Sequence, residues 1–221
     1  MTQLSNTRGN ATRQANKTLR RERLLSIARE LISGNGFEAF TINELALKAQ
    51  VSIPTVHNLL GKKSDIFEHL VVDMVAKVEA ALAQPNIKDP IVATETFIDS
   101  LLDLFAANET FYKAAFVAGE RTQFFEHELP TGIFNKSLSI AMQVCVDAKK
   151  NGFLQGNIDV DWLAKQLFGC QRLARHDWVN GYISLSEYRT QVLIGAFITL
   201  AADATPSFQL RLFAVIKSLA S

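Results

Sequence analysis

The sequence is poor in the patterns that mark metal sites, disulfide frameworks, membrane spans and common enzymes. Its two cysteines, Cys145 and Cys170, form no CxxC or Cys/His cluster, and its four histidines have no metal-ligand spacing. No GxSxG, P-loop or GxGxxG motif is present. Charged residues interrupt every apolar run before it reaches the roughly 18–20 residues of a membrane span. We therefore expect a non-enzymatic, cofactor-free protein that stays in the cytoplasm and binds no membrane.

The chain also lacks the alternating apolar and polar residues of β-strands, whereas helical spacing runs along most of its length. Leu24, Ala28, Leu31 and Ile32, for example, repeat on one helix face before glycines end the pattern. An all-α protein follows from this spacing. The predicted helices cover about 17–34, 42–49, 52–59, 64–83, 90–107, 109–118, 131–150, 159–180, 184–203 and 206–220.

Residues 41–63 carry the signals of two short helices joined by a tight turn. Thr41 and Glu44 have the spacing of a capping box, and Ser52 caps the second helix, where Pro54 is tolerated in the first turn. Two such helices form a helix-turn-helix, whose second helix enters the major groove of DNA. The polar side chains left to meet phosphates and base edges are those of Ser52, Thr55, His57 and Asn58, followed by Lys62 and Lys63.

Basic residues are concentrated at the start of the chain. Residues 1–70 hold ten Lys and Arg against six Asp and Glu, whereas residues 71–221 hold thirteen against sixteen. A basic front on a mildly acidic body suits a polyanionic partner such as double-stranded operator DNA, although a solvated tail would explain the same charge run. The residues predicted to contact DNA are Arg20, Arg21, Thr41, Ser52, Pro54, Thr55, His57, Asn58 and Lys63.

A family resemblance covers about residues 20–70. It rests on the run GFEAFTINELA at 36–46, AQVS at 49–52, and Lys63, which resemble the DNA-binding domain of the TetR family of regulators. The resemblance implies an all-α homodimer with a three-helix N-terminal domain and a variable ligand-binding domain, usually a repressor that leaves its operator when a ligand binds. We accordingly assign residues 1–16 to a flexible basic arm, 17–65 to a helix-turn-helix domain, and 66–221 to a larger helical domain for ligand binding and dimerisation.

Four positions depart from the usual pattern of the family. In family members, glycine is usual at the position of Gln50 and common at that of Pro54. A phosphate-contacting tyrosine is usual at the position of His57, and phenylalanine at that of Leu60. A non-glycine residue in the left-handed conformation costs about 1–2 kcal/mol, so we expect the turn at Gln50 to be shaped differently. The operator sequence does not carry over.

The second half of the chain is rich in large apolar side chains at helical spacing, with a few polar ones among them. Such a mixture suits a pocket for a small, mainly apolar effector, and it suits a plain core equally well. The candidate ligand-binding residues are Phe105, Tyr112, Phe116, Arg121, Met142, Phe168, Gln171 and Arg175.

The last long helices, about 159–180 and 184–203, offer surface for a homodimer built as a four-helix bundle, although an internal core would use the same residues. The candidate interface residues are Trp162, Leu167, Cys170, Trp178, Val192, Ala196, Phe197 and Leu200, with small Gly169, Ala174, Gly195 and Ala201 between them.

The function favoured by these patterns is a ligand-responsive, DNA-binding transcriptional regulator. Two alternatives remain open at this point. One is a thiol-redox-sensing regulator that uses Cys145 and Cys170, and the other is a helical protein-interaction adaptor without a small-molecule ligand.

Overall fold

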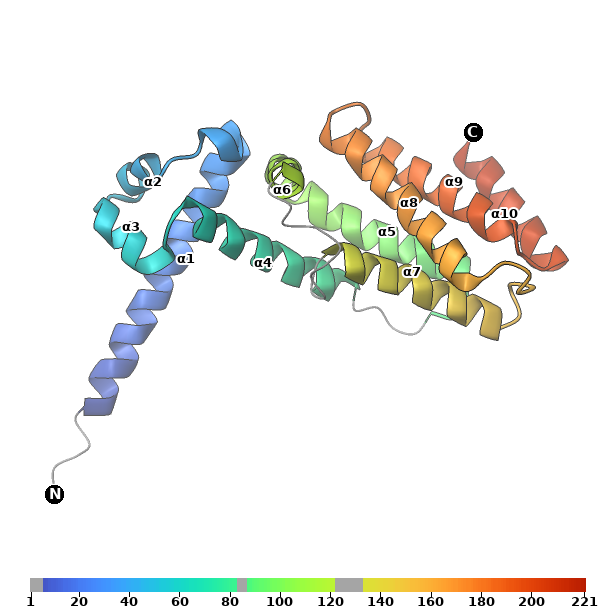
Figure 1. Cartoon of the computed structure of the whole chain (residues 1–221), viewed down its shortest axis with the longest axis horizontal. Helices are drawn as coiled ribbons and strands as arrows, with labels where there is room; N and C mark the ends of the chain where they lie inside the picture. The colour runs from blue at the N-terminus through green and yellow to red at the C-terminus, as the bar shows by residue number, and fades with distance from the viewer. Residues whose placement is uncertain (1–5, 83–86, 122–132) are drawn as a thin grey trace, which may run out of the picture. The chain divides into compact units, whose positions relative to one another are not determined.

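The computed structural model describes residues 6–82, 87–121 and 133–221, and their regular elements are α-helices (Figure 1). The all-α prediction is therefore confirmed. These residues form two compact units. The first runs to Met74 and includes Thr110–Ala118, and the second comprises Val75–Glu109 and the chain from Gly119 onward. In the described ranges no helix is both long and apolar enough to cross a membrane.

Three N-terminal helices pack against one another in the first unit. Helix α1 contacts both α2 and α3, which also contact each other, and the start of α4 belongs to the same unit. Leu24, Ala28 and Ile32 from the predicted apolar face of α1 are buried here, as are Val56 and Leu60 from α3. The helix bounds are Asn6–Ala39 for α1, Ile42–Ala49 for α2, Ile53–Leu60 for α3 and Lys63–Leu82 for α4.

Helix α1 is longer than its apolar pattern predicts. Residues 6–16, which the sequence analysis assigns to a flexible arm, are helical in the structure, and residues 1–5 lie outside the described ranges. Near its other end Gly36 has φ 78°, a left-handed value that breaks the helix before one more turn to Ala39. The predicted glycine stop therefore falls at Gly36.

The second unit is a helical bundle. Helix α8 packs against α7 and α9, α5 packs against the same two helices, and α10 packs against α9. The predicted end at Ala83 and the predicted start at residue 131 lie outside the described residues. The bounds are Pro90–Ala106 for α5, Ile133–Lys150 for α7, Val160–Val179 for α8, Leu185–Ala201 for α9 and Pro206–Leu219 for α10. Helix α6 spans Glu109–Arg121, and its residues Thr110–Ala118 belong to the first unit.

Aromatic side chains fill the centre of this bundle. The rings of Phe105 and Trp178 stack with centroids 5.1 Å apart, and Tyr188 meets both edge-on. The indole Nε1 of Trp178 donates to Glu109 Oε1 at 3.0 Å. Among the candidate interface residues, those buried within the single chain are Leu167, Trp178, Val192, Ala196, Phe197, Leu200, Ala174 and Ala201, so the internal-core interpretation is correct for these eight.

Gly195 also serves packing within one chain. A Cβ atom at this position would lie 2.8 Å from Sγ of Cys170, closer than real Cβ contacts allow. The absence of a side chain therefore lets α9 approach α8 closely at this point.

A buried carboxylate connects two loops at one end of the bundle. Asp203 accepts hydrogen bonds from the backbone N–H groups of Gly156, Asn157 and Ile158 at 2.8, 2.9 and 3.2 Å. The backbone of Leu154 also forms an isolated β-bridge with Ala204. We call this arrangement the Asp203 clamp, because it fastens the α7–α8 loop to the α9–α10 turn.

Candidate DNA interface and ligand pocket

The turn between α2 and α3 is left-handed at Gln50. This residue has φ 57° and ψ 43°, and its N–H closes the end of α2 on the carbonyls of Ala46 and Leu47. The N–H of Val51 also donates to the Ala46 carbonyl, at 3.0 Å. The expectation of a differently shaped turn was therefore wrong. The turn keeps the conformation that favours glycine, and Gln50 carries the conformational cost.

Side-chain caps fix the starts of both short helices. Thr41 Oγ1 accepts from the Glu44 N–H at 3.2 Å, and Ser52 Oγ accepts from the Thr55 N–H at 3.3 Å. The reciprocal half of the predicted capping box is missing at Thr41, because the Glu44 carboxylate instead accepts from Asn35 Nδ2 at 3.4 Å. Local hydrogen bonds therefore position α3.

One side of α3 is buried and the other is open to solvent. Val56 and Leu60 are buried, whereas His57 and Asn58 are exposed. His57 Nδ1 donates to the Gly61 carbonyl at 3.1 Å, which leaves Nε2 available to an outside partner. The other exposed members of the predicted set are Arg20, Thr41, Ser52 and Pro54, and Thr55 is half-buried.

Sequence reasoning missed an apolar residue on this open side. Ile53, the first residue of α3, is 41% exposed. An aliphatic side chain at this position has the chemistry to contact a thymine methyl group in the major groove. No signal in the sequence indicated this exposure, because Ile53 lies three residues before buried Val56 and helical spacing would assign it to the same face.

Two of the predicted DNA contacts have partners inside the protein. Arg21 Nη1 donates to the Leu59 carbonyl at 3.2 Å, and its Nη2 lies 2.8 Å from Nε2 of His69. A guanidinium only donates, so His69 accepts and is neutral in this contact. Lys63 Nζ donates to the Glu38 carbonyl at 2.9 Å. In this state both basic side chains hold helices together, and their contact with DNA stays a prediction.

At the start of α4, where Lys62 and Lys63 are expected to meet DNA phosphates, an acidic side chain is already present. Asp65 Oδ2 accepts from the Lys62 backbone N–H at 2.8 Å. This hydrogen bond lowers the pKa of Asp65 below its ordinary value, with smaller contributions from Ser64 and nearby positive charges. A phosphate would therefore have to displace this carboxylate or bind the lysine side chains alone.

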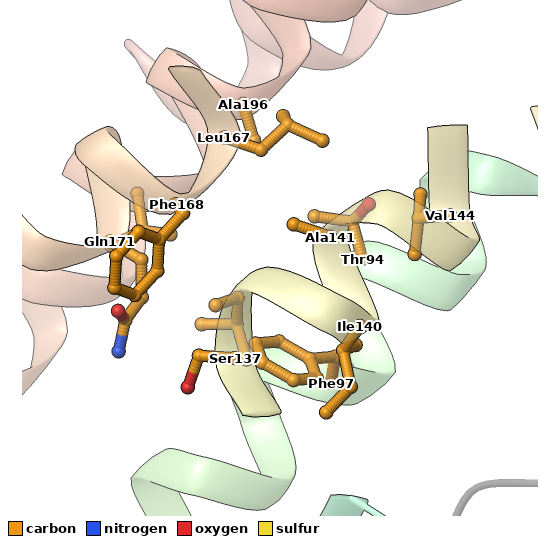
Figure 2. Close-up of a pocket in the computed structure, with 12 residues that line it drawn as sticks. Thr94, Phe97, Ser137, Ile140, Ala141, Val144, Leu167, Phe168, Gln171 and Ala196 are labelled. Carbon is orange, nitrogen blue, oxygen red and sulfur yellow. The ribbon is translucent and has the colours of Figure 1, made fainter. Parts of the chain in front are cut away.

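The second unit contains a partly open pocket (Figure 2). Helices α5, α7, α8 and α9 all contribute to its wall. Of the candidate ligand-binding residues, Phe168 and Gln171 line it. The lining residues are Thr94, Phe97, Ile98, Ser137, Ile140, Ala141, Val144, Leu167, Phe168, Gln171, Val192 and Ala196.

The remaining candidates whose side chains are described are not among the lining residues. Phe105 is buried against Trp178, while Tyr112 and Phe116 are buried within the first unit. Met142 is half-buried on α7, and the side chain of Arg121 lies outside the described part of the structure. Their contact with a ligand stays a prediction.

Arg175 stands directly behind Gln171. Its Nη1 donates to Gln171 Oε1 at 3.3 Å, and Gln171 Nε2 donates to the Tyr188 hydroxyl at 3.1 Å. Burial lowers the pKa of Arg175, which is only 1% exposed, and raises the pKa of Tyr188 to about 12. A polar network therefore connects the pocket wall to the aromatic core.

The two cysteines have the environment of core residues. Burial raises the pKa of the Cys145 thiol to about 12, and burial also raises the pKa of Cys170, which lies against Gly195. The reactive form of cysteine is the thiolate, which such shifts disfavour at neutral pH. These environments argue against the thiol-redox alternative.

The fold and site define a class: a helix-turn-helix domain joined to a larger helical domain that holds a pocket. Residues 24–70 match the family described as "Bacterial regulatory proteins, tetR family". This match confirms, over residues 24–70, the resemblance seen in the sequence. No curated protein sequence matches the chain.

Several solved structures, among them TetR-family proteins, share the fold over most of the chain. A TetR-family transcriptional regulator from Marinobacter aquaeolei VT8 matches with a TM-score of 0.66 at 16% identity, over 90% of this chain and 98% of that one. For CprB from S. coelicolor A3(2) the TM-score is 0.66 at 17% identity, over 91% and 96%. For SmeT in complex with triclosan it is 0.62 at 14% identity, over 86% and 94%. At these identities the likeness shows the fold.

Proposed function

We propose that this protein is a ligand-responsive repressor whose helix α3 reads operator DNA. The observation that carries the proposal is the outward surface of α3, where His57 and Asn58 are exposed while Val56 and Leu60 anchor the helix from behind. An asparagine can pair with adenine through two hydrogen bonds, and small hydroxyls can donate to phosphate. Exposed Arg20 adds sequence-independent attraction to the DNA backbone.

The proposed functional form is a homodimer formed through α8 and α9. After the internal core is filled, these helices still present large apolar side chains: Trp162 is 62% exposed, Leu173 57% and Ile198 55%. Trp162 and Gly169 are the candidate interface residues that remain exposed. A dimer places two α3 helices for successive major grooves when their separation is about 34–36 Å.

Release from DNA follows from ligand binding in the pocket of the second unit. A ligand that prefers a state with the wrong spacing of the two α3 helices shifts the population away from DNA. Support for a small-molecule effector comes from the pocket itself, and from the complex of the structural relative SmeT with triclosan.

The test is binding to the DNA upstream of the gene itself, measured by fluorescence anisotropy at several salt concentrations. Wild-type protein should bind with an affinity that falls steeply as salt rises. The double change Thr55→Ala and Asn58→Ala should weaken specific binding by about a hundredfold, since each lost base contact is worth about 1–3 kcal/mol. The size of the particle in light scattering should stay that of a dimer.

The matched control is the pair Ser186→Ala and Ser207→Ala, which removes two exposed hydroxyls from α9 and α10. Its affinity for DNA should equal that of the wild type. Undiminished operator recognition by the Thr55 and Asn58 variant would contradict the assignment of α3. A protein that ignores its own upstream DNA at every salt concentration would favour the adaptor alternative.

A further inference from the structure

Ser137 places a hydroxyl in the pocket wall that has no hydrogen-bond partner among the described residues. The residue lies on α7, lines the pocket and is only 7% exposed. Within the described parts of the chain, no residue forms a hydrogen bond with its Oγ. The Oγ is not among the enclosed, unpartnered side-chain atoms of these parts, so it is open to the space of the pocket. This hydroxyl is therefore available to a molecule inside the pocket.

The other polar side chains of the lining are already engaged. Thr94 Oγ1 donates to the Pro90 carbonyl at 2.7 Å, and both ends of the Gln171 carboxamide have partners. The carboxamide still keeps one N–H and one lone pair for a further bond. Ser137 is thus the primary polar contact that the wall offers, with Gln171 as a secondary one.

The lining contains no charged residue. The positive charge of Arg175 is separated from the pocket by the carboxamide of Gln171, to which it donates. A carboxylate or ammonium group entering this wall would lose its hydration without gaining an opposite charge in contact. The electrostatics of the lining therefore favour a neutral ligand.

Ser137 and Gln171, the polar side chains of the lining that can still donate a hydrogen bond, lie toward the same side of the pocket in the view of Figure 2. Val144 lies toward the other side, with Thr94, whose hydroxyl donates to the Pro90 carbonyl. Resting on the proposed function, we infer that the effector is a neutral, mainly apolar molecule with a hydrogen-bonding oxygen at one end. Its oxygen pairs with the Ser137 hydroxyl, and its apolar body lies against Leu167, Val144 and the remaining lining.

The experiment is calorimetric titration of the full-length protein with decan-1-ol, decanoate and decylammonium, which share a chain and differ in the charge of the head group. Decan-1-ol should bind at least about tenfold more tightly than either ion. Ser137→Ala should weaken decan-1-ol binding about three- to tenfold, the usual value of one hydrogen bond. Ser139→Ala, an exposed serine two residues along α7, should leave binding unchanged.

The free Ser137→Ala protein provides a second readout. Because the Ser137 hydroxyl forms no hydrogen bond with the described residues, its removal should leave the unfolding midpoint equal to that of the wild type, which separates ligand binding from structural damage. Tighter binding of decanoate or decylammonium, equal loss in both serine variants, or no binding of any of the three would overturn the inference. DNA binding without ligand is measured separately. A protein that binds operator DNA but none of the three probes would therefore contradict the inference about the ligand and leave the proposed DNA-binding function standing.

Discussion

Replacing Gln50 by glycine should stabilise the protein through the backbone alone. Gln50 is exposed and holds a left-handed conformation, which costs a residue with a Cβ atom about 1–2 kcal/mol. Glycine removes that cost and adds about 0.5–1 kcal/mol of entropy to be lost on folding. The net gain is about 0.5–1 kcal/mol, or roughly 1–4 °C in the unfolding midpoint for a chain of this size.

The control for this prediction is Gln50→Ala, which keeps a Cβ atom and so keeps the strain. Both variants and the wild type should be unfolded by heat and by urea under the same conditions. Equal stability of Gln50→Gly and Gln50→Ala would refute the reasoning, because it would show that the left-handed conformation costs nothing at this turn. Operator affinity should be unchanged in both, since Gln50 lies outside α3.

Two further predictions concern groups away from the turn. Asp203→Ala should lower the free energy of unfolding by about 3 kcal/mol in urea titrations, because three backbone N–H groups lose a charged acceptor, whereas the isosteric Asp203→Asn should lose less. Equal losses would mean that the charge contributes nothing. Burial and the Arg21 guanidinium lower the pKa of His69 below its ordinary 6.5. The unfolded chain therefore binds a proton that the folded chain does not, and stability should fall as the pH drops below about 6.5. His69→Gln should flatten this decline in urea midpoints measured across that pH range, and an unchanged slope would exclude His69 as its source.

Capping residues and apolar spacing were sufficient to locate most of the fold. Ser184 and Glu187 have the sequence spacing of a capping box and form both of its hydrogen bonds, and α9 begins directly after Ser184. Such signals are local, so a single sequence shows them. The spacing could not place residues 6–16, since they are helical without any apolar face that would predict a helix.

The DNA-contacting surface was more predictable than the pocket. Exposure of His57 and Asn58 follows from the helical period once Val56 and Leu60 are assigned to the core. A pocket forms where the inward faces of packed helices leave a space between them, and the helical periodicity of a sequence does not show where that happens. Ser137, Ile140, Ala141 and Val144 have the spacing of one helix face, yet nothing in the sequence indicates that this face borders a hollow.

The same limitation explains the mistaken dimer residues. Trp178 and Phe197 are large and apolar at the right spacing, and a single sequence cannot tell whether such a face meets its own chain or a second copy. In the structure both are buried within one chain. The exposed Leu173 and Ile198 are better candidates for a dimer interface, and they can be identified only once the structure shows which apolar residues form the core.

The Asp203 clamp makes the α7–α8 end of the pocket a pivot. Helices α7 and α8 run antiparallel from the clamped loop, and at about 1.5 Å per residue Ser137 lies roughly 20 Å along α7 from that loop. On a lever arm of this length, a small rotation produces little displacement beside the clamp and its largest displacement between Ser137 and Gln171. The hydrogen-bonding end of the pocket is thus the end at which a bound molecule has the greatest mechanical advantage over the two helices.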